Sequence, residues 1–201
     1  MKLVSLLAIV AATTLCMTSH ASASDENNAP PADRSIYESI ELGFKLCSKQ
    51  IIGQGHLAPE HGAMLEDMGV SLLEEVPADV AQNTGPLFLK DPIYAQIDTD
   101  GAGVFIVTAK GHIACRVVVT DTTNALKPRI QFVDALRRTS TWTYDQRRSG
   151  TFAGQMREEL TAADGRLVAI MNGPNFIAND GKGVQAFLTV AALPPTAPAG
   201  H

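Results

Sequence analysis

Two glycine-containing turns between short strand-like segments constrain the fold of this chain more than any other feature of its sequence. Residues 93–98, 104–109 and 112–120 have the composition and period of β-strands. Asp100-Gly101 and Lys110-Gly111 lie between these segments and suit tight hairpin turns, because glycine readily takes the positive φ angles that such turns need. The segment therefore predicts an antiparallel meander.

Two-residue turns would also fix the register of this meander. They place Ile97 opposite Val104. They place Ile106 opposite Ala95 on one side and opposite Cys115 on the other. Since successive side chains of a strand point to opposite faces, one sheet face collects apolar residues and should be buried. These residues are Ile93, Ala95, Ile97, Val104, Ile106, Ile113, Cys115, Val117 and Val119.

An amphipathic helix is predicted upstream, over residues 35–52. Ser35 and Glu38 have the spacing of a capping box, and Gly53 suits the end of the helix. Apolar side chains recur at steps of three and four residues and so share one face. They are Ile36, Ile40, Phe44, Cys47 and Ile51.

The cysteines favour one disulfide bond. Cys16 lies in an N-terminal segment that we expect to be removed, which leaves Cys47 and Cys115. Cys47 lies on the apolar stripe of the first helix and Cys115 in the middle of the apolar sheet face. A helix packed on that face would bring the two sulfur atoms together, so we predict a Cys47–Cys115 bond. The alternative is two separate buried thiols.

The rest of the chain continues the mixture of helices and strands. A short helix is predicted over 59–68, with further helical turns within 70–80. A longer helix is predicted from a cap at Asp121 or Thr122 to Arg138, with Ile130, Val133 and Leu136 facing inward and Phe132 as a further inward candidate.

A second meander is predicted over 141–147, 151–161 and 166–172, followed by a last strand over 184–193. A three-residue loop at 148–150 would place Trp142 opposite Met156, which separates apolar from polar side chains.

Together these elements predict an α+β fold. N-terminal helices pack on an antiparallel meander sheet of six to seven strands, and one helix separates the two meanders. A single domain is expected over 35–193. One continuous sheet is the simpler arrangement, and two sheets are the alternative.

The N-terminus has the pattern of a secretory signal peptide. Lys2 is followed by an apolar run from Leu3 to Leu15, and a small-residue cleavage site ends at Ala23. We expect a signal peptide over 1–23, a disordered leader over 24–34 and a flexible tail over 194–201. The protein would then be periplasmic or fully secreted. No second long apolar run follows, so we expect no membrane span in the mature chain.

Charge is distributed unevenly along the chain. Residues 25–100 carry 14 acidic against 4 basic side chains, a net of −10, and residues 101–201 carry 7 against 11, a net of +4. Opposite charges on the two halves favour their packing into one body, with complementary surfaces. Nucleic-acid binding is not expected, because no dense Lys/Arg stripe is interleaved with aromatic residues.

His56 and His61, with Glu60 between them, are the candidate metal ligands. Copper and zinc are the ions that imidazole suits best. The five-residue spacing differs from the four-residue spacing of the zincin motif. A solvated helix start, with Glu60 placed for the helix dipole, is the alternative interpretation.

Arg147 and Arg157 are expected on the polar face of the second meander, where arginine side chains can bind carboxylate or sulfate groups. The loop 172–183 adds Phe176, Ile177 and Lys182 as candidate contacts with a partner.

The sequence contains no Gly-x-Ser-x-Gly motif and no other catalytic signature, and it implies no cofactor. It favours an exported, non-enzymatic binding or accessory protein that contacts an envelope protein or a small ligand. One alternative is a cell-envelope hydrolase with its site near Glu60 and His61. The other is a metal-binding protein that uses His56 and His61. The oligomeric state is left open.

Overall fold

The computed structural model describes residues 34–84, 90–111, 113–174 and 180–194. The chain divides into two units, Met1–Pro30 and Pro31–His201, and all described residues belong to the second. The predicted signal peptide, most of the leader, most of the tail and Phe176 lie outside the described residues.

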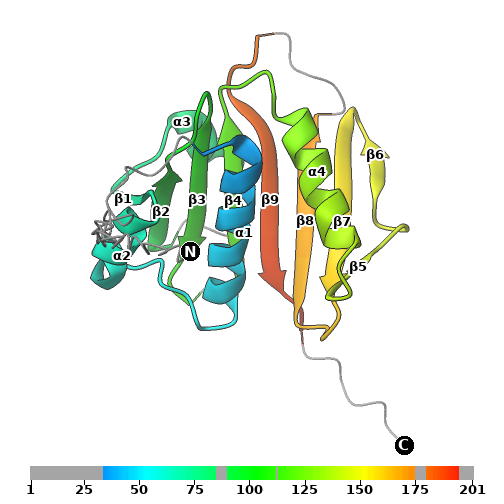
Figure 1. Ribbon diagram of the computed structural model, residues 1–201, viewed down its shortest axis with the longest axis horizontal. Coiled ribbons are helices and arrows are strands. Elements are labelled where there is room, and N and C mark those ends of the chain that lie inside the picture. Colours follow the sequence, from blue (N-terminus) through cyan, green and yellow to red (C-terminus); the bar gives the residue numbers. More distant parts are fainter. Residues whose placement is uncertain (1–33, 85–89, 112, 175–179, 195–201) are drawn as a thin grey trace, which may run out of the picture. The chain divides into compact units, whose positions relative to one another are not determined.

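The described residues form one mixed α+β body around a nine-stranded antiparallel sheet, with strand order β1-β2-β3-β4-β9-β8-β7-β5 and β6 paired with β7 (Figure 1). The helices are α1 (Ile36–Ile51), the 3-10 helix η2 (Pro59–His61), α2 (Gly62–Asp67), α3 (Ala78–Thr84) and α4 (Leu126–Arg137). The strands are β1 (Val70–Leu73), β2 (Pro92–Ile97), β3 (Gly103–Ala109), β4 (Ala114–Thr120), β5 (Trp142–Tyr144), β6 (Gly150–Phe152), β7 (Gln155–Ala162), β8 (Leu167–Pro174) and β9 (Val184–Ala192).

The α+β class and the antiparallel sheet are confirmed, but the predicted six to seven strands are too few. One extra strand, β1, occupies part of the segment predicted to be helical. Val70, the first residue of β1, pairs with Ile97 and is fully buried. The segment therefore forms a strand because it pairs with β2. The other extra strand, β6, forms a tight hairpin with β7, since Ala153 and Gly154 both have positive φ angles.

The β6 hairpin also changes the pairing predicted for the second meander. Trp142 lies opposite Ala162, not opposite Met156. The chain leaves β5, loops out through 145–149 and continues in the same direction as β6, beside the same edge of β7. This extra turn takes up the residues that a simple three-residue loop would have placed in a long strand.

Helices cover the two faces of the sheet unequally. We call the inner face the one on which α1 and α4 pack side by side, α1 against β3, β4 and β9 and α4 against β5 and β8 (Figure 1). The larger core lies beneath them, where Phe44 contacts Phe132 and Trp142 with ring centroids 5.3 Å apart in both pairs. On the opposite, outer face, α3 packs against β4 and β9 and buries Val80 in a smaller core.

The predicted register of the first meander is confirmed at β2–β3 and wrong at β3–β4. Ile97 pairs with Val104, but Ile106 pairs with Val117 and not with Cys115. The connection after β3 is longer than the predicted two-residue turn, and it leaves Ile113 66% exposed. Because the shift is by two residues, the strand residues keep their predicted faces.

Two predictions for α4 are also wrong. The helix begins at Leu126, after Ala125, and Asp121 takes a positive φ angle instead of capping it. Ile130 is exposed, whereas Val133, Leu136 and the further candidate Phe132 are buried as predicted.

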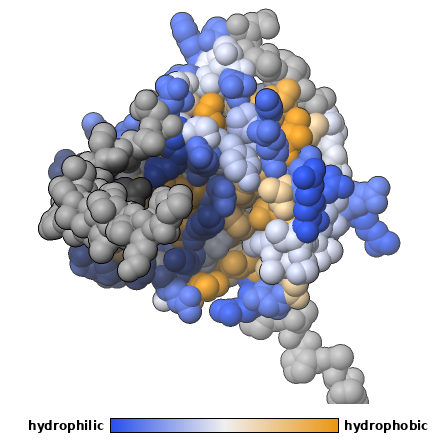
Figure 2. All heavy atoms as spheres, viewed as in Figure 1, coloured by the Kyte–Doolittle hydropathy of each residue, from blue (hydrophilic) through white to orange (hydrophobic). Residues whose placement is uncertain are grey.

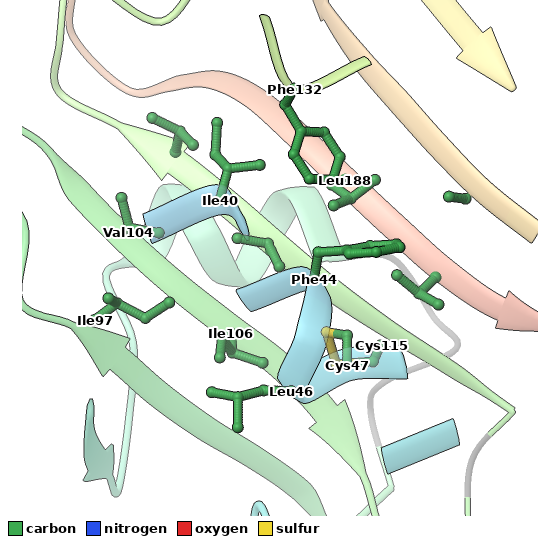
Figure 3. Packing of buried hydrophobic residues seen from close by; sticks show 14 of the residues in the cluster. Ile40, Phe44, Leu46, Cys47, Ile97, Val104, Ile106, Cys115, Phe132 and Leu188 are labelled. Atoms are coloured by element: carbon green, nitrogen blue, oxygen red, sulfur yellow. A yellow bond between two sulfur atoms is a disulfide. The ribbon is translucent and has the colours of Figure 1, made fainter. Parts of the chain in front are cut away.

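The predicted Cys47–Cys115 disulfide is present, with both cysteines fully buried (Figure 3). Gly43 explains how α1 approaches β4 closely enough: a Cβ atom there would lie 2.7 Å from a methyl carbon of Val117. The four-residue step from Gly43 to Cys47 advances about 6 Å along α1, and the two-residue step from Val117 to Cys115 covers about 6.6 Å along β4. Cys47 therefore lies over Cys115 when Gly43 lies over Val117.

The described ion pairs do not join the two oppositely charged halves of the chain. Ion pairs between described residues join side chains of the same half, such as Lys45 with Glu41 and Arg157 with Glu159. The sheet order explains this, because it places β1 and β2 at one edge and β5 to β8 toward the other. The prediction of complementary charged surfaces is therefore not met by the described ion pairs.

Candidate functional site

The outer face of β6 and β7, with the turn before β6, carries a cluster of charged and aromatic side chains that we call the arginine hollow, formed by Arg148, Phe152, Arg157 and Glu159. It is an open depression of about 500 Å³. The described helix on this face, α3, packs farther along the sheet, against β4 and β9.

Glu159 organises the hollow. Its side chain is only 3% exposed, and each carboxylate oxygen accepts a hydrogen bond from a different arginine. Nη1 of Arg148 lies 3.0 Å from Oε1, and Nη2 of Arg157 lies 2.6 Å from Oε2. The bond to Glu159 holds the pKa of Arg148 above its ordinary value. One buried carboxylate thus orients two guanidinium groups that remain partly exposed.

The turn between β5 and β6 positions Arg148. Oδ1 of Asp145 accepts the backbone N–H groups of Arg147 and Arg148, and its Oδ2 lies 3.7 Å from Nε of Arg148. Ser149 donates its hydroxyl to the carbonyl of Asp145 and accepts the backbone N–H of Glu159. These contacts tie the turn to β7, so that the arginine is held by its backbone as well as by its ion pair.

Phe152 supplies an apolar edge to the hollow. It lies opposite Gln155 at the tip of the β6–β7 hairpin and is 56% exposed. Each guanidinium group has donors beyond those bonded to Glu159, and such groups bind carboxylates in a planar, two-point manner. An exposed aromatic ring beside two oriented arginines has the composition of interface hot spots.

The polar surface continues across the sheet toward β4. Glu159 lies opposite Ile170, which lies opposite Thr189. Beyond them, Nε of Arg116 donates to the Thr189 hydroxyl, and its guanidinium carbon lies 4.7 Å from the ring centroid of Phe187. Burial lowers the pKa of Arg116.

The predicted binding residues have different positions. Arg157 lies on the outer face as expected from strand alternation. Arg147 is exposed in the turn, and the adjacent Arg148 is the residue that joins Arg157 on Glu159. Lys182 is exposed in the segment before β9, and Phe176 lies outside the described residues. Their roles in binding stay predictions.

Sequence reasoning missed three of the four residues of the arginine hollow: Arg148, Phe152 and Glu159. The alternation of β7 carried a signal for Glu159, because residues 157 and 159 of one strand share a face. Arg148 and Phe152 depend on the β6 hairpin, whose Ala-Gly turn was not recognised.

The predicted metal ligands lie together. The ring centroids of His56 and His61 are 4.5 Å apart, and Nδ1 of His56 is buried without a hydrogen-bond partner. Within the described ranges, no group of three or more His, Cys, Asp or Glu side chains is placed to hold a metal ion. Glu60, the residue of the hydrolase alternative, is exposed in η2.

Another hollow lies on the other side of the molecule, between α1 and α4. It has a volume of about 720 Å³ and is lined by Tyr37, Glu38, Glu41, Gln131, Asp134 and Arg138, among others. Figure 2 shows this helix-bearing face as largely hydrophilic, with small separate hydrophobic areas. Its carboxylates already have partners: Glu38 caps α1, Glu41 pairs with Lys45 and Asp134 pairs with Arg137.

A polar cluster lies under α4 on the inner face. Arg129 is fully buried and donates to the carbonyl of Pro174 and to the sulfur of Met156. Glu158 is half-buried, and burial raises its pKa more than the positive charge of Arg129 lowers it. The hollow that Arg129 lines, with Pro174 and Gln185 among others, has a volume of only about 10 Å³, and Glu158 does not line it. We therefore interpret this pair as part of the packing of α4.

Comparison of the chain with protein families, with curated protein sequences and with solved structures gives no match. Among the described residues, no helix has the length and apolar character needed to span a membrane.

Proposed function

We propose that this chain is an exported, non-enzymatic binding or accessory protein that holds an acidic segment of an envelope protein against the arginine hollow. The observation that carries this proposal is the pair of arginines fixed on buried Glu159 beside exposed Phe152.

The form of the hollow favours a protein partner over a small ligand. Small-molecule sites are usually enclosed, whereas this surface is open. Arginine and aromatic residues are enriched where protein interfaces carry their binding energy. The guanidinium groups are already oriented, so less side-chain freedom is lost when a carboxylate binds.

Export is part of the same proposal. It is supported by the N-terminal pattern of charge, apolar run and small residues, and by a disulfide typical of oxidising compartments. The hydrolase alternative near Glu60 and His61 stays a prediction.

Site-specific photo-crosslinking in the native host tests the proposal. A photoreactive phenylalanine analogue at position 152 should crosslink to one protein. The same analogue at Ile130, an exposed position on α4, should not, because it lies on the opposite face of the sheet.

Charge variants then distinguish a specific contact from a chance one. Arg157→Gln should abolish the crosslink from position 152, whereas Arg166→Gln, which removes an exposed arginine from the β7–β8 turn, should leave it unchanged. Equal crosslinking from positions 152 and 130, or insensitivity to Arg157→Gln, would overturn the proposal.

A further inference from the structure

The loop between α1 and η2 holds two imidazole rings together. It is anchored by Leu57, whose side chain is buried and whose backbone N–H donates to Oε1 of Gln50. The carbonyl of His56 accepts the backbone N–H of Ala58, and the carbonyl of Ala58 accepts that of His61. These two short hydrogen-bonded turns bring both histidines to one side of the loop.

The spacing of the rings fits two ligands of one metal ion. Ring nitrogens bind such ions at about 2.0–2.1 Å, which puts each ring centroid about 3.2 Å from the ion. The two ring planes are 84° apart, and for an ion that lies in both planes and binds one nitrogen of each ring, centroids 4.5 Å apart subtend an angle of about 90° at the ion. Neighbouring ligands at about 90° are typical of tetragonal sites, the geometry of Cu²⁺ and Ni²⁺, whereas tetrahedral zinc needs a wider angle.

The buried Nδ1 of His56 is a second, independent indication. It has no hydrogen-bond partner in the structure, although buried ring nitrogens are normally satisfied. A metal ion would satisfy such an atom. Exposed carboxylates that follow closely in the chain, at Glu60, Glu66 and Asp67, add negative potential that favours a cation.

We propose that His56 and His61 together form a site for a divalent transition-metal ion, best suited to Cu²⁺. Since the described residues offer no third His, Cys, Asp or Glu at this point, water would complete the coordination. Such a site would exchange its ion readily. Cu²⁺ is the divalent first-row ion that nitrogen ligands bind most strongly.

Titration of the mature chain with CuCl₂ alone, in a non-chelating buffer at pH 7.5, tests the proposal by calorimetry and by electron paramagnetic resonance. We expect one principal equivalent of Cu²⁺ with hyperfine coupling to two imidazole nitrogens. The resonance spectrum of the wild-type protein counts the ligands directly, so the test does not depend on any variant folding.

Variants identify which histidines bind. His56→Gln and His61→Gln should each weaken binding at least about tenfold, because each removes one of two protein ligands. His112→Gln and His201→Gln, which change other histidines, are the matched controls and should leave affinity unchanged. One imidazole nitrogen in the wild-type spectrum, or equal affinity of all four variants, would overturn the proposal.

Discussion

Removal of the Cys47–Cys115 bond is the perturbation whose effect is best defined by the structure. The bond closes a loop across 68 residues of sequence. On the chain-entropy model, opening a loop of this length costs about 4 kcal/mol of stability. For a domain of this size, about 2–4 °C of melting temperature is lost per kcal/mol, so we expect a loss of about 8–16 °C.

Thermal unfolding of Cys47→Ala, Cys115→Ala and the double variant measures this loss. Each single variant breaks the same bond, so the double variant should be only slightly less stable than either. The sum of the two single-variant losses should therefore exceed the loss of the double variant by about 4 kcal/mol. Wild-type protein, reduced while unfolded and then refolded with reductant present, should approach the double variant. Simple additivity of the two single losses would refute the reasoning.

Two further substitutions test packing and burial. Gly43→Ala should lower the free energy of unfolding by about 1 kcal/mol despite its better helix propensity, because the new methyl group would lie 2.7 and 2.9 Å from the methyl carbons of Val117. Gly62→Ala, where a methyl group meets no atom within 4 Å, is the matched control in urea titrations and should be neutral or stabilising. Glu158→Gln should stabilise the protein at pH 7 but not at pH 4. Burial raises the folded-state pKa of Glu158 above its ordinary value near 4.5, so wild-type stability falls as pH rises from that value through the raised pKa. Melting curves of both proteins at the two pH values check this, and an unchanged or lower melting temperature of Glu158→Gln at pH 7 would show that the attraction to Arg129 dominates.

The sequence predicted the parts of the fold that local rules determine. The capping box at Ser35 and the Asp100-Gly101 turn are both present. The disulfide followed from two local patterns, the apolar stripe that contains Cys47 and the sheet face that contains Cys115. Each pattern is set by the period of its own element, so neither required knowledge of the sheet order.

Features that depend on pairing between distant segments could not be predicted in this way. β1 is only four residues long, and the residues that make it a strand are its partners in β2. The arginine hollow depends on the Ala153-Gly154 turn, which pairs β7 antiparallel with β6 and brings Glu159 to Arg148. Arg147 has the same charge as Arg148 and precedes it in the chain, but it is Arg148 that this turn places against Glu159.

Availability of the two guanidinium groups for a carboxylate is the premise on which the proposed function rests. Nuclear magnetic resonance of the arginine Nε–H groups tests it most directly, in a titration of the mature protein with a hexaglutamate peptide. We expect saturable shifts of the Arg148 and Arg157 signals and no comparable shift at Arg166. Equal, non-saturating shifts at all three arginines, or none at Arg148 and Arg157, would contradict the account.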